Sequence, residues 1–156
     1  MKYKQILPFL ICIGLAFLAG AIGSFYTFPN IASWYAGLVH PSWTPPNWVF
    51  GPVWTTLYIL MGMAAALIWR SGRKGTLLPL ALYFVQLTVN ASWSIVFFGM
   101  HNLIGGLVII KVLWLMIAAL MALSWRYSRT ATYLLIPYLL WVTYAATLNL
   151  GIFLLN

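Results

Sequence analysis

Five stretches of mostly apolar residues, each of roughly 20 residues, constrain this chain more than any other feature of its sequence. At a rise of about 1.5 Å per residue, a helix of that length crosses the hydrocarbon of a bilayer, which is about 30 Å thick. The stretches cover residues 6–26, 48–69, 76–98, 103–125 and 132–154. The chain is 64% hydrophobic and contains no Asp or Glu, so a water-soluble fold could not cover its apolar surface. We therefore predict an all-α membrane protein, a bundle of five transmembrane helices forming a single domain over residues 1–156.

The first apolar stretch follows Lys2 and Lys4 and ends among small residues, a pattern shared with secretory signal peptides. The apolar part of a signal peptide usually has about 7–15 residues, whereas residues 6–26 are enough to span a bilayer. We therefore predict a retained helix.

The cations indicate how the helices are oriented. Seven of the eight lie at one side of the predicted bundle: Lys2, Lys4, Arg70, Arg73, Lys74, Arg126 and Arg129. By the positive-inside rule, the N-terminus is cytoplasmic and the C-terminus lies outside, in what we expect to be a bacterial cell membrane. Because these cations sit at separate helix ends and not in one basic patch, we expect no nucleic-acid partner despite the net charge of +8.

The lack of carboxylate side chains excludes several kinds of chemistry. Paired-acid hydrolysis, Ser-His-Asp catalysis, carboxylate metal sites and Asp/Glu proton relays all need a group that this chain does not contain. We predict no metal site and no required cofactor, since neither a metal-ligand cluster nor a glycine-rich phosphate loop is found. His40 and His101 lie on the predicted outer side, where either could approach a haem iron, but we expect both to be solvated or interfacial.

The first connection, residues 27–47, is the only long one, and Pro41, Pro45 and Pro46 stiffen it. Its rings Trp34, Tyr35 and Trp43 suit the headgroup level of a membrane and could form no more than an aromatic belt. A long, stiff loop on a rigid scaffold is, however, more typical of a functional element. We therefore predict a lid. The residues proposed to form it are Trp34, Pro41, Pro45 and Pro46.

Polar and aromatic side chains recur at helical spacing in three of the predicted helices. The stripes are Gln86, Asn90, Trp93 and Phe97; Trp54, Tyr58, Met61 and Ala65; and Tyr138, Trp141, Ala145 and Leu148. Amides at mid-depth are costly against lipid, so the polar stripe should face the bundle. From the residues alone, the stripes could be ordinary helix packing or the walls of a ligand pocket.

Several motifs resemble the signature of the TspO/MBR family (translocator protein, peripheral-type benzodiazepine receptor), and the chain is similar to its bacterial members. The motifs are Trp34-Tyr35, Pro41-Ser42-Trp43-Thr44-Pro45-Pro46 and Trp48-Val49-Phe50-Gly51-Pro52-Val53-Trp54-Thr55, with Tyr58, Met61-Gly62, Asn90, Trp93, Phe97-Phe98-Gly99, Pro137-Tyr138-Leu139, Trp141 and Leu148-Asn149 further along. The resemblance covers nearly the whole chain. It implies a five-helix bundle, commonly a homodimer, with a pocket below the first loop for porphyrins and for isoquinoline or benzodiazepine compounds.

With this resemblance, the stripes are interpreted as the walls of a tetrapyrrole pocket, because indole and phenol rings stack on a planar macrocycle. The predicted ligand contacts are Trp43, Trp54, Tyr58, Asn90, Trp93, Phe97, Tyr138, Trp141, Ala145 and Leu148. The favoured function is a membrane protein that binds porphyrin or haem-type tetrapyrroles as a sensor, carrier or regulator. One alternative is an enzyme that degrades protoporphyrin IX in light and oxygen, with Trp54 and Trp141 as catalytic candidates. Another is a passive scaffold whose aromatic residues only pack and anchor.

Two features depart from the family pattern. Animal members bind sterols through a C-terminal motif with Tyr followed by a basic residue, and residues 148–156 contain neither, so cholesterol is not an expected ligand. Lys111 lies within the fourth predicted helix, where it could snorkel along the lipid face or neutralise a porphyrin propionate.

A run of small residues in the first predicted helix allows close helix approach: Ala16, Ala19, Gly20, Gly23 and Ser24. The sequence leaves open whether this run packs inside the bundle or forms the contact of a homodimer.

Overall fold

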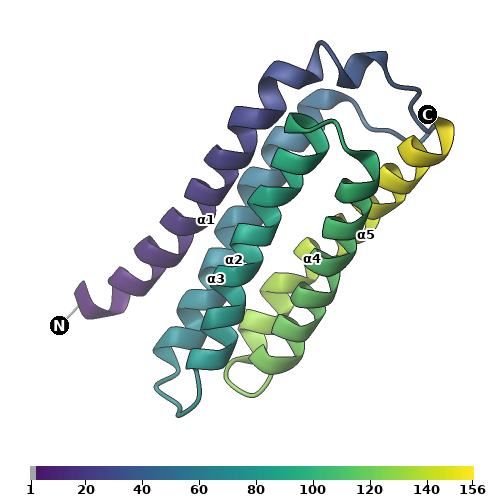
Figure 1. The fold of residues 1–156 in the computed structure, drawn as a ribbon. Helices are drawn as coiled ribbons and strands as arrows, with labels where there is room; N and C mark the ends of the chain where they lie inside the picture. The colour runs from purple at the N-terminus through teal and green to yellow at the C-terminus, as the bar shows by residue number, and fades with distance from the viewer. Residues whose placement is uncertain (1–2) are drawn as a thin grey trace.

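The computed structural model describes residues 3–156 and consists of five long helices joined by one long loop and otherwise short connections (Figure 1). They are α1 (Tyr3–Ile31), α2 (Phe50–Arg70), α3 (Leu77–Ser94), α4 (Leu103–Ser124) and α5 (Arg129–Leu155). Each overlaps or coincides with a segment that is long and apolar enough to cross a membrane. The all-helical, five-span architecture predicted from the sequence is confirmed. Lys2 lies outside the described residues, as does the side chain of Lys4.

The first helix is longer than predicted. It continues to Ile31 instead of ending at residue 26, and it includes Pro29. Side-chain bonds support these last turns, because Thr27 Oγ1 donates to the Gly23 carbonyl and Asn30 Nδ2 donates to the Tyr26 carbonyl. The first loop is correspondingly shorter, and short helices occur within it (η1, Tyr35–Gly37) and at its end (η2, Asn47–Val49).

The other helix boundaries lie within a few residues of those predicted, and local contacts explain where they fall. The side chain of Asn102 caps α4 by accepting from the Gly105 N–H, and Ser128 caps α5 by accepting from the Ala131 N–H. At its far end, α3 widens into a π-helical turn, η3 (Ile95–Gly99). The two buried phenylalanines Phe97 and Phe98 lie on this turn.

Each helix packs against specific neighbours. α1 contacts α2 and α3, while α5 contacts α2 and α4, and α3 also contacts α4. The small residues of α1 are used inside this chain: Ala16 is fully buried, and a Cβ added at Gly23 would come within 2.9 Å of Ser94 Oγ. Ala16 and Gly23 of this run therefore pack inside the bundle.

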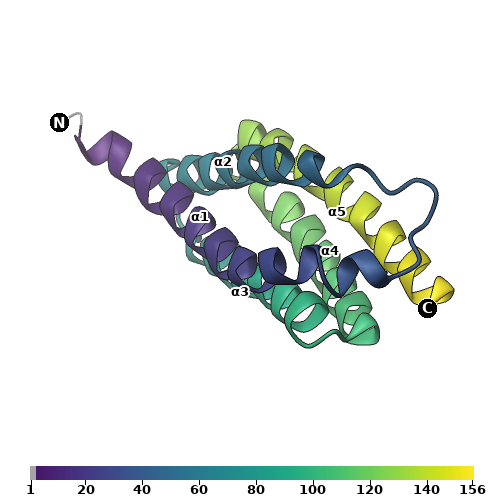
Figure 2. The same cartoon turned by 90° about the horizontal axis from the view of Figure 1, so that it is seen from above.

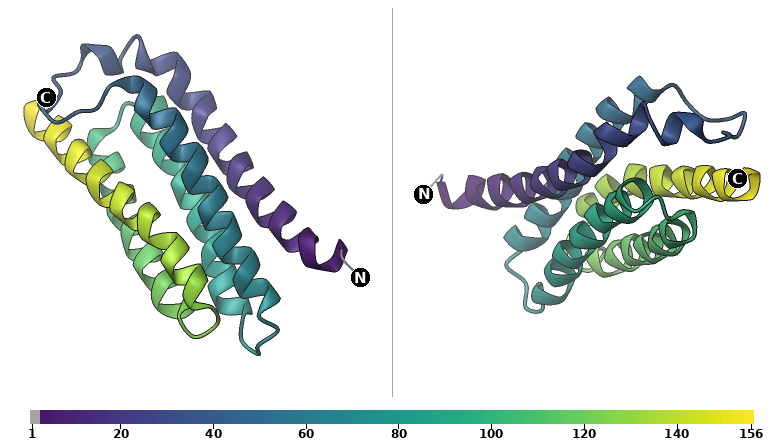
Figure 3. Two further views of the ribbon diagram at one scale, coloured as in Figure 1. Left: turned by 180° about the vertical axis from the view of Figure 1, so that it is seen from behind. Right: turned by 45° about the horizontal axis from the view of Figure 1, so that its top comes forward.

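The loop between α1 and α2 crosses one end of the bundle, reaches the C-terminal end of α5 and returns to α2 (Figures 1 and 3). Side chains of α5 hold it there. Asn156 pairs with the backbone of Val39 through two hydrogen bonds, each of 3.0 Å, and the Tyr144 hydroxyl donates to the Trp43 carbonyl at 2.7 Å. The loop is thus fastened across the bundle at several points.

Candidate functional site

A cavity of about 420 Å³ lies between α1, α2, α3 and α5, next to the loop. This volume falls within the usual range for small-molecule sites, about 300–1,000 Å³. Every side chain that lines it within the described residues is uncharged. An uncharged, largely apolar cavity suits a flat hydrophobic ligand with few polar groups.

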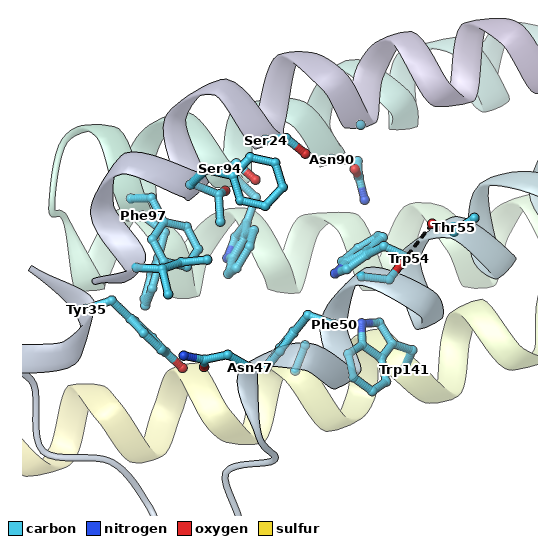
Figure 4. A pocket seen from close by; sticks show the side chains of 18 of the residues that line it. Ser24, Tyr35, Asn47, Phe50, Trp54, Thr55, Asn90, Ser94, Phe97 and Trp141 are labelled. Atoms are coloured by element: carbon cyan, nitrogen blue, oxygen red, sulfur yellow. Dashed lines mark hydrogen bonds between the residues drawn. The ribbon is translucent and has the colours of Figure 1, made fainter. Parts of the chain in front are cut away.

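Aromatic rings form the walls of this cavity (Figure 4). Trp54 stacks on Tyr58 along α2, with ring centroids 5.5 Å apart, and Trp93 stacks on Phe97 along α3 and η3 at 5.2 Å. Trp141 of α5 meets the edge of Phe50 at 5.7 Å. These rings offer both flat faces and edges to a planar guest.

Asparagines provide part of the polar surface of the cavity. Asn90 of α3 donates from Nδ2 to the Tyr138 hydroxyl at 3.0 Å, and its Oδ1 lies 3.5 Å from the Tyr58 hydroxyl. Asn149 of α5 accepts a bond of 3.1 Å from the indole N–H of Trp93. Both amides are therefore held in place by neighbouring helices before any ligand arrives.

Two further polar groups lie at the cavity. The indole nitrogen of Trp141 is buried and has no hydrogen-bond partner among the described residues. Burial raises the pKa of the Tyr35 hydroxyl, with a smaller contribution from Tyr144, so Tyr35 remains a neutral phenol. The cavity thus presents hydrogen-bonding groups without a fixed charge.

Most of the predicted contact residues lie on the wall of the cavity. Eight of the ten line the cavity: Trp54, Tyr58, Asn90, Trp93, Phe97, Trp141, Ala145 and Leu148. Phe97 and Leu148 are also nearly fully buried by the surrounding protein. The three stripes therefore converge as the helical spacing indicated.

Trp43 and Tyr138 are the exceptions, because the structure places both outside the cavity. Trp43 lies beside Gly151 on α5 and is 52% exposed, since the loop reaches the C-terminal end of that helix before it turns back. Tyr138 is fully buried below Asn90, with its hydroxyl bonded between Asn90 and Gln86. Helical spacing gave the correct helix face for Tyr138, but it did not indicate the depth at which the cavity ends.

The predicted lid residues belong to the loop, yet they do not line the cavity. Trp34 stacks on His101 at 4.4 Å and meets the edge of Phe97 at 5.5 Å. Pro41 is buried beside Gly151, while Pro45 is half-buried and Pro46 is exposed. Tyr35 and Asn47 are the loop residues that reach the cavity. The prolines therefore shape the loop, and other residues of the loop and its ends form the inner surface.

Sequence reasoning missed the wall that α1 contributes. Seven residues of this helix line the cavity: Phe17, Gly20, Ala21, Ser24, Thr27, Phe28 and Ile31. The signal for it is the pair of small residues Gly20 and Ser24, spaced four apart, which by itself indicates only close helix approach. Phe50 also lines the cavity without having been predicted as a contact residue, although it belongs to the motif at residues 48–55.

Lys111 and the two histidines take no part in the cavity wall. Lys111 is exposed on α4, as expected for a side chain that snorkels along the lipid face, so the structure does not support a role in binding a propionate within the cavity. His101 is exposed and pairs with Asn30, and His40 is half-buried with its Nε2 near the Tyr35 carbonyl. Neither histidine is placed to reach a guest in the cavity.

Comparisons with known proteins agree with this architecture. The profile of the TspO/MBR family matches residues 12–155. The chain is 46% identical to the tryptophan-rich protein TspO of Chlorobaculum tepidum over 98% of both chains, and 44% identical to that of Archaeoglobus fulgidus over 91% of this chain and 93% of the relative. It is also 39% identical to the translocator protein of Sus scrofa, over 91% of this chain and 88% of the relative.

Proposed function

Because this chain belongs to the TspO/MBR family, we propose that it is a multi-pass membrane protein that binds a porphyrin or haem-type tetrapyrrole as a sensor, carrier or regulator. The observation that carries this proposal is the uncharged cavity whose walls are the stacked pairs Trp54–Tyr58 and Trp93–Phe97. A planar macrocycle gains most from such walls, since stacking adds to the burial of its faces. Isoquinoline and benzodiazepine compounds are expected to occupy the same cavity.

The absence of charge from the cavity wall indicates how a porphyrin would lie. Its propionates would be costly to bury without a cation, so they should point toward the membrane surface at the loop. The apolar edge would then lie deeper, near Ala145, where a small side chain leaves room.

Tryptophan fluorescence of the detergent-purified chain, titrated with protoporphyrin IX in darkness, tests binding. Saturable quenching that Ala145→Phe weakens at least tenfold would support the pocket. Leu140→Phe, at an exposed position of the same helix that does not line the cavity, is the matched control and should leave the titration unchanged. Absence of saturation would refute the proposal and leave a passive scaffold as the better description.

Degradation of the porphyrin in light and oxygen is the second candidate function. The observation in its favour is that the indoles of Trp54 and Trp141 both line the cavity, where either could exchange an electron with an excited macrocycle. Illumination of the complex decides between the two functions. Loss of porphyrin absorbance that disappears in Trp54→Phe or Trp141→Phe, while binding in darkness survives, would establish an enzyme, whereas binding without turnover would support a carrier or regulator.

We also propose the orientation with the basic end of the bundle in the cytoplasm of a bacterial cell and the loop outside. Cys12 is the single cysteine of the chain, so labelling of Ser42→Cys and Ser128→Cys in a Cys12→Ala background tests this orientation in intact cells. An impermeant reagent should label position 42 and spare position 128.

A homodimer is a further proposal. It would use a lipid-facing surface other than the small-residue run of α1, which packs inside this chain.

A further inference from the structure

Below the floor of the cavity, hydrogen bonds connect four side chains from three helices. Gln86 Nε2 of α3 lies 3.9 Å from Met61 Sδ of α2, and Gln86 Oε1 accepts a bond of 2.9 Å from the Tyr138 hydroxyl of α5. The Tyr138 oxygen in turn accepts from Asn90 Nδ2 at 3.0 Å. Met61, Gln86 and Tyr138 are fully buried, so no bulk water competes for these bonds.

The thioether of Met61 determines which group donates and which accepts in each hydrogen bond of this array. A thioether sulfur accepts hydrogen bonds and has no proton to donate, so the Gln86 amide presents its nitrogen to Met61 and its oxygen to Tyr138. Tyr138 must then donate its only hydroxyl proton to Gln86, which leaves its oxygen free to accept. Asn90 can satisfy that oxygen only with its NH₂ group.

The direction of the array therefore sets the orientation of the Asn90 amide. With Nδ2 committed to Tyr138, the carbonyl oxygen Oδ1 lies on the side of Tyr58, and both Asn90 and Tyr58 line the cavity. The contact between Oδ1 and the Tyr58 hydroxyl is long, at 3.5 Å, and a carbonyl oxygen can accept two bonds. The oxygen keeps the capacity to accept from a guest.

We propose that Gln86 and Tyr138 are positioning residues that fix the Asn90 amide with its oxygen toward the cavity, so that the site selects a ligand that donates a hydrogen bond at this point. The ligand class is a flat aromatic molecule with an N–H or O–H on its edge, such as a lactam. This inference rests on the proposed function of the cavity, and it assigns a specificity to one wall of it. Neither Gln86 nor Tyr138 lines the cavity, so both act through Asn90.

Two matched probes test the inference on the full chain in detergent: an aryl isoquinolinone, whose lactam N–H donates, and its O-methyl ether, whose ring nitrogen only accepts. The wild-type chain should bind the isoquinolinone about tenfold more tightly, because the ether leaves one acceptor facing another. Gln86→Met keeps the side-chain volume but removes the acceptor for Tyr138. The Tyr138 proton should then turn to Asn90, reverse the amide and bring the affinity ratio below one.

Tyr138→Phe frees the Asn90 amide without reversing it, so the ratio should fall to about one. Leu87→Met, a buried change of similar volume next to Gln86 in the chain, leaves all four side chains of the array in place and should keep the tenfold preference. If Gln86→Met weakens both probes equally and preserves the ratio, its role is only structural and the inference is overturned. If the wild-type chain and all three variants bind the two probes with equal affinity, the selectivity is refuted while the pocket stands. Failure of the wild-type chain to bind either probe or protoporphyrin IX would refute the pocket as well.

Discussion

The two halves of this bundle use the same helices in opposite ways. We call the half of the bundle next to the α2–α3 and α4–α5 connections the basic half. There α1 and α2 are so close that a Cβ on Gly62 would lie 2.6 Å from the Cα of Ile13. In the half below the loop, the cavity half, the two helices separate (Figure 2). Residues from Phe17 and Tyr58 outward line the cavity there. Alanines such as Ala64 and Ala65 fill the narrow space of the basic half, and large rings surround the open space of the other. A closed half that fixes the helices allows the opposite half to remain hollow.

The largest expected effect comes from placing one substitution in each half. Ala65 is 1% exposed in the closed core, so Ala65→Phe should overpack it and destabilise the chain by about 3 kcal/mol. Ala145 borders the cavity, so Ala145→Phe should leave the unfolding temperature in detergent nearly unchanged while it weakens porphyrin binding at least tenfold. Equal unfolding temperatures for the two variants would contradict the division into a closed half and an open half.

A smaller effect is expected from adding one methyl group at a glycine in each half. Gly62→Ala would press on the backbone of Ile13, which cannot rotate away, and should cost about 1–3 kcal/mol of unfolding free energy. Gly20→Ala would press on the Tyr58 ring, which can turn into the cavity, so its main result should be weaker ligand binding. Thermal unfolding and porphyrin titration of both variants measure the difference, and the reverse order of stability would refute it.

The loop contacts should affect the rate of ligand exchange more than stability. Tyr144→Phe removes the hydroxyl that donates to the Trp43 carbonyl, a bond worth about 1 kcal/mol. We expect porphyrin to dissociate several-fold faster in stopped-flow measurements, with little change in unfolding temperature. Tyr133→Phe, an exposed position on the same helix, is the control. Unchanged dissociation in both variants would mean that the loop does not restrain the ligand.

The smallest effect, close to none, is expected for Lys111→Met. The ammonium group is exposed on α4, which supplies no cavity wall in the described residues, so porphyrin affinity and its dependence on pH should match the wild-type chain. A clear loss of porphyrin affinity would mean that Lys111 contacts the ligand, and it would require a different position for the ligand.

The sequence alone predicted much of the fold and much of the cavity wall, for a physical reason. A bilayer offers no partners for backbone N–H and C=O groups, so an apolar stretch of this length must form a helix, and helical spacing then places Trp54 and Tyr58, or Trp93 and Phe97, on one face. The same spacing could not predict that α1 would extend through Pro29. That extension depends on side-chain bonds from Thr27 and Asn30.

What the sequence by itself determined is therefore the number of spans, the polar faces and the family motifs. Only the tertiary structure decided where the cavity stops and which residues surround it. α1 and α2 are in close contact where Gly62 lies against Ile13, and they separate toward the loop (Figure 2). Phe17 and Ser24 lie on the separated part of α1 and therefore line the cavity. Likewise, Tyr138 became a buried support because Asn90 covers it. Such distances between helices are set by contacts between side chains far apart in the chain, and a local sequence pattern does not predict these contacts.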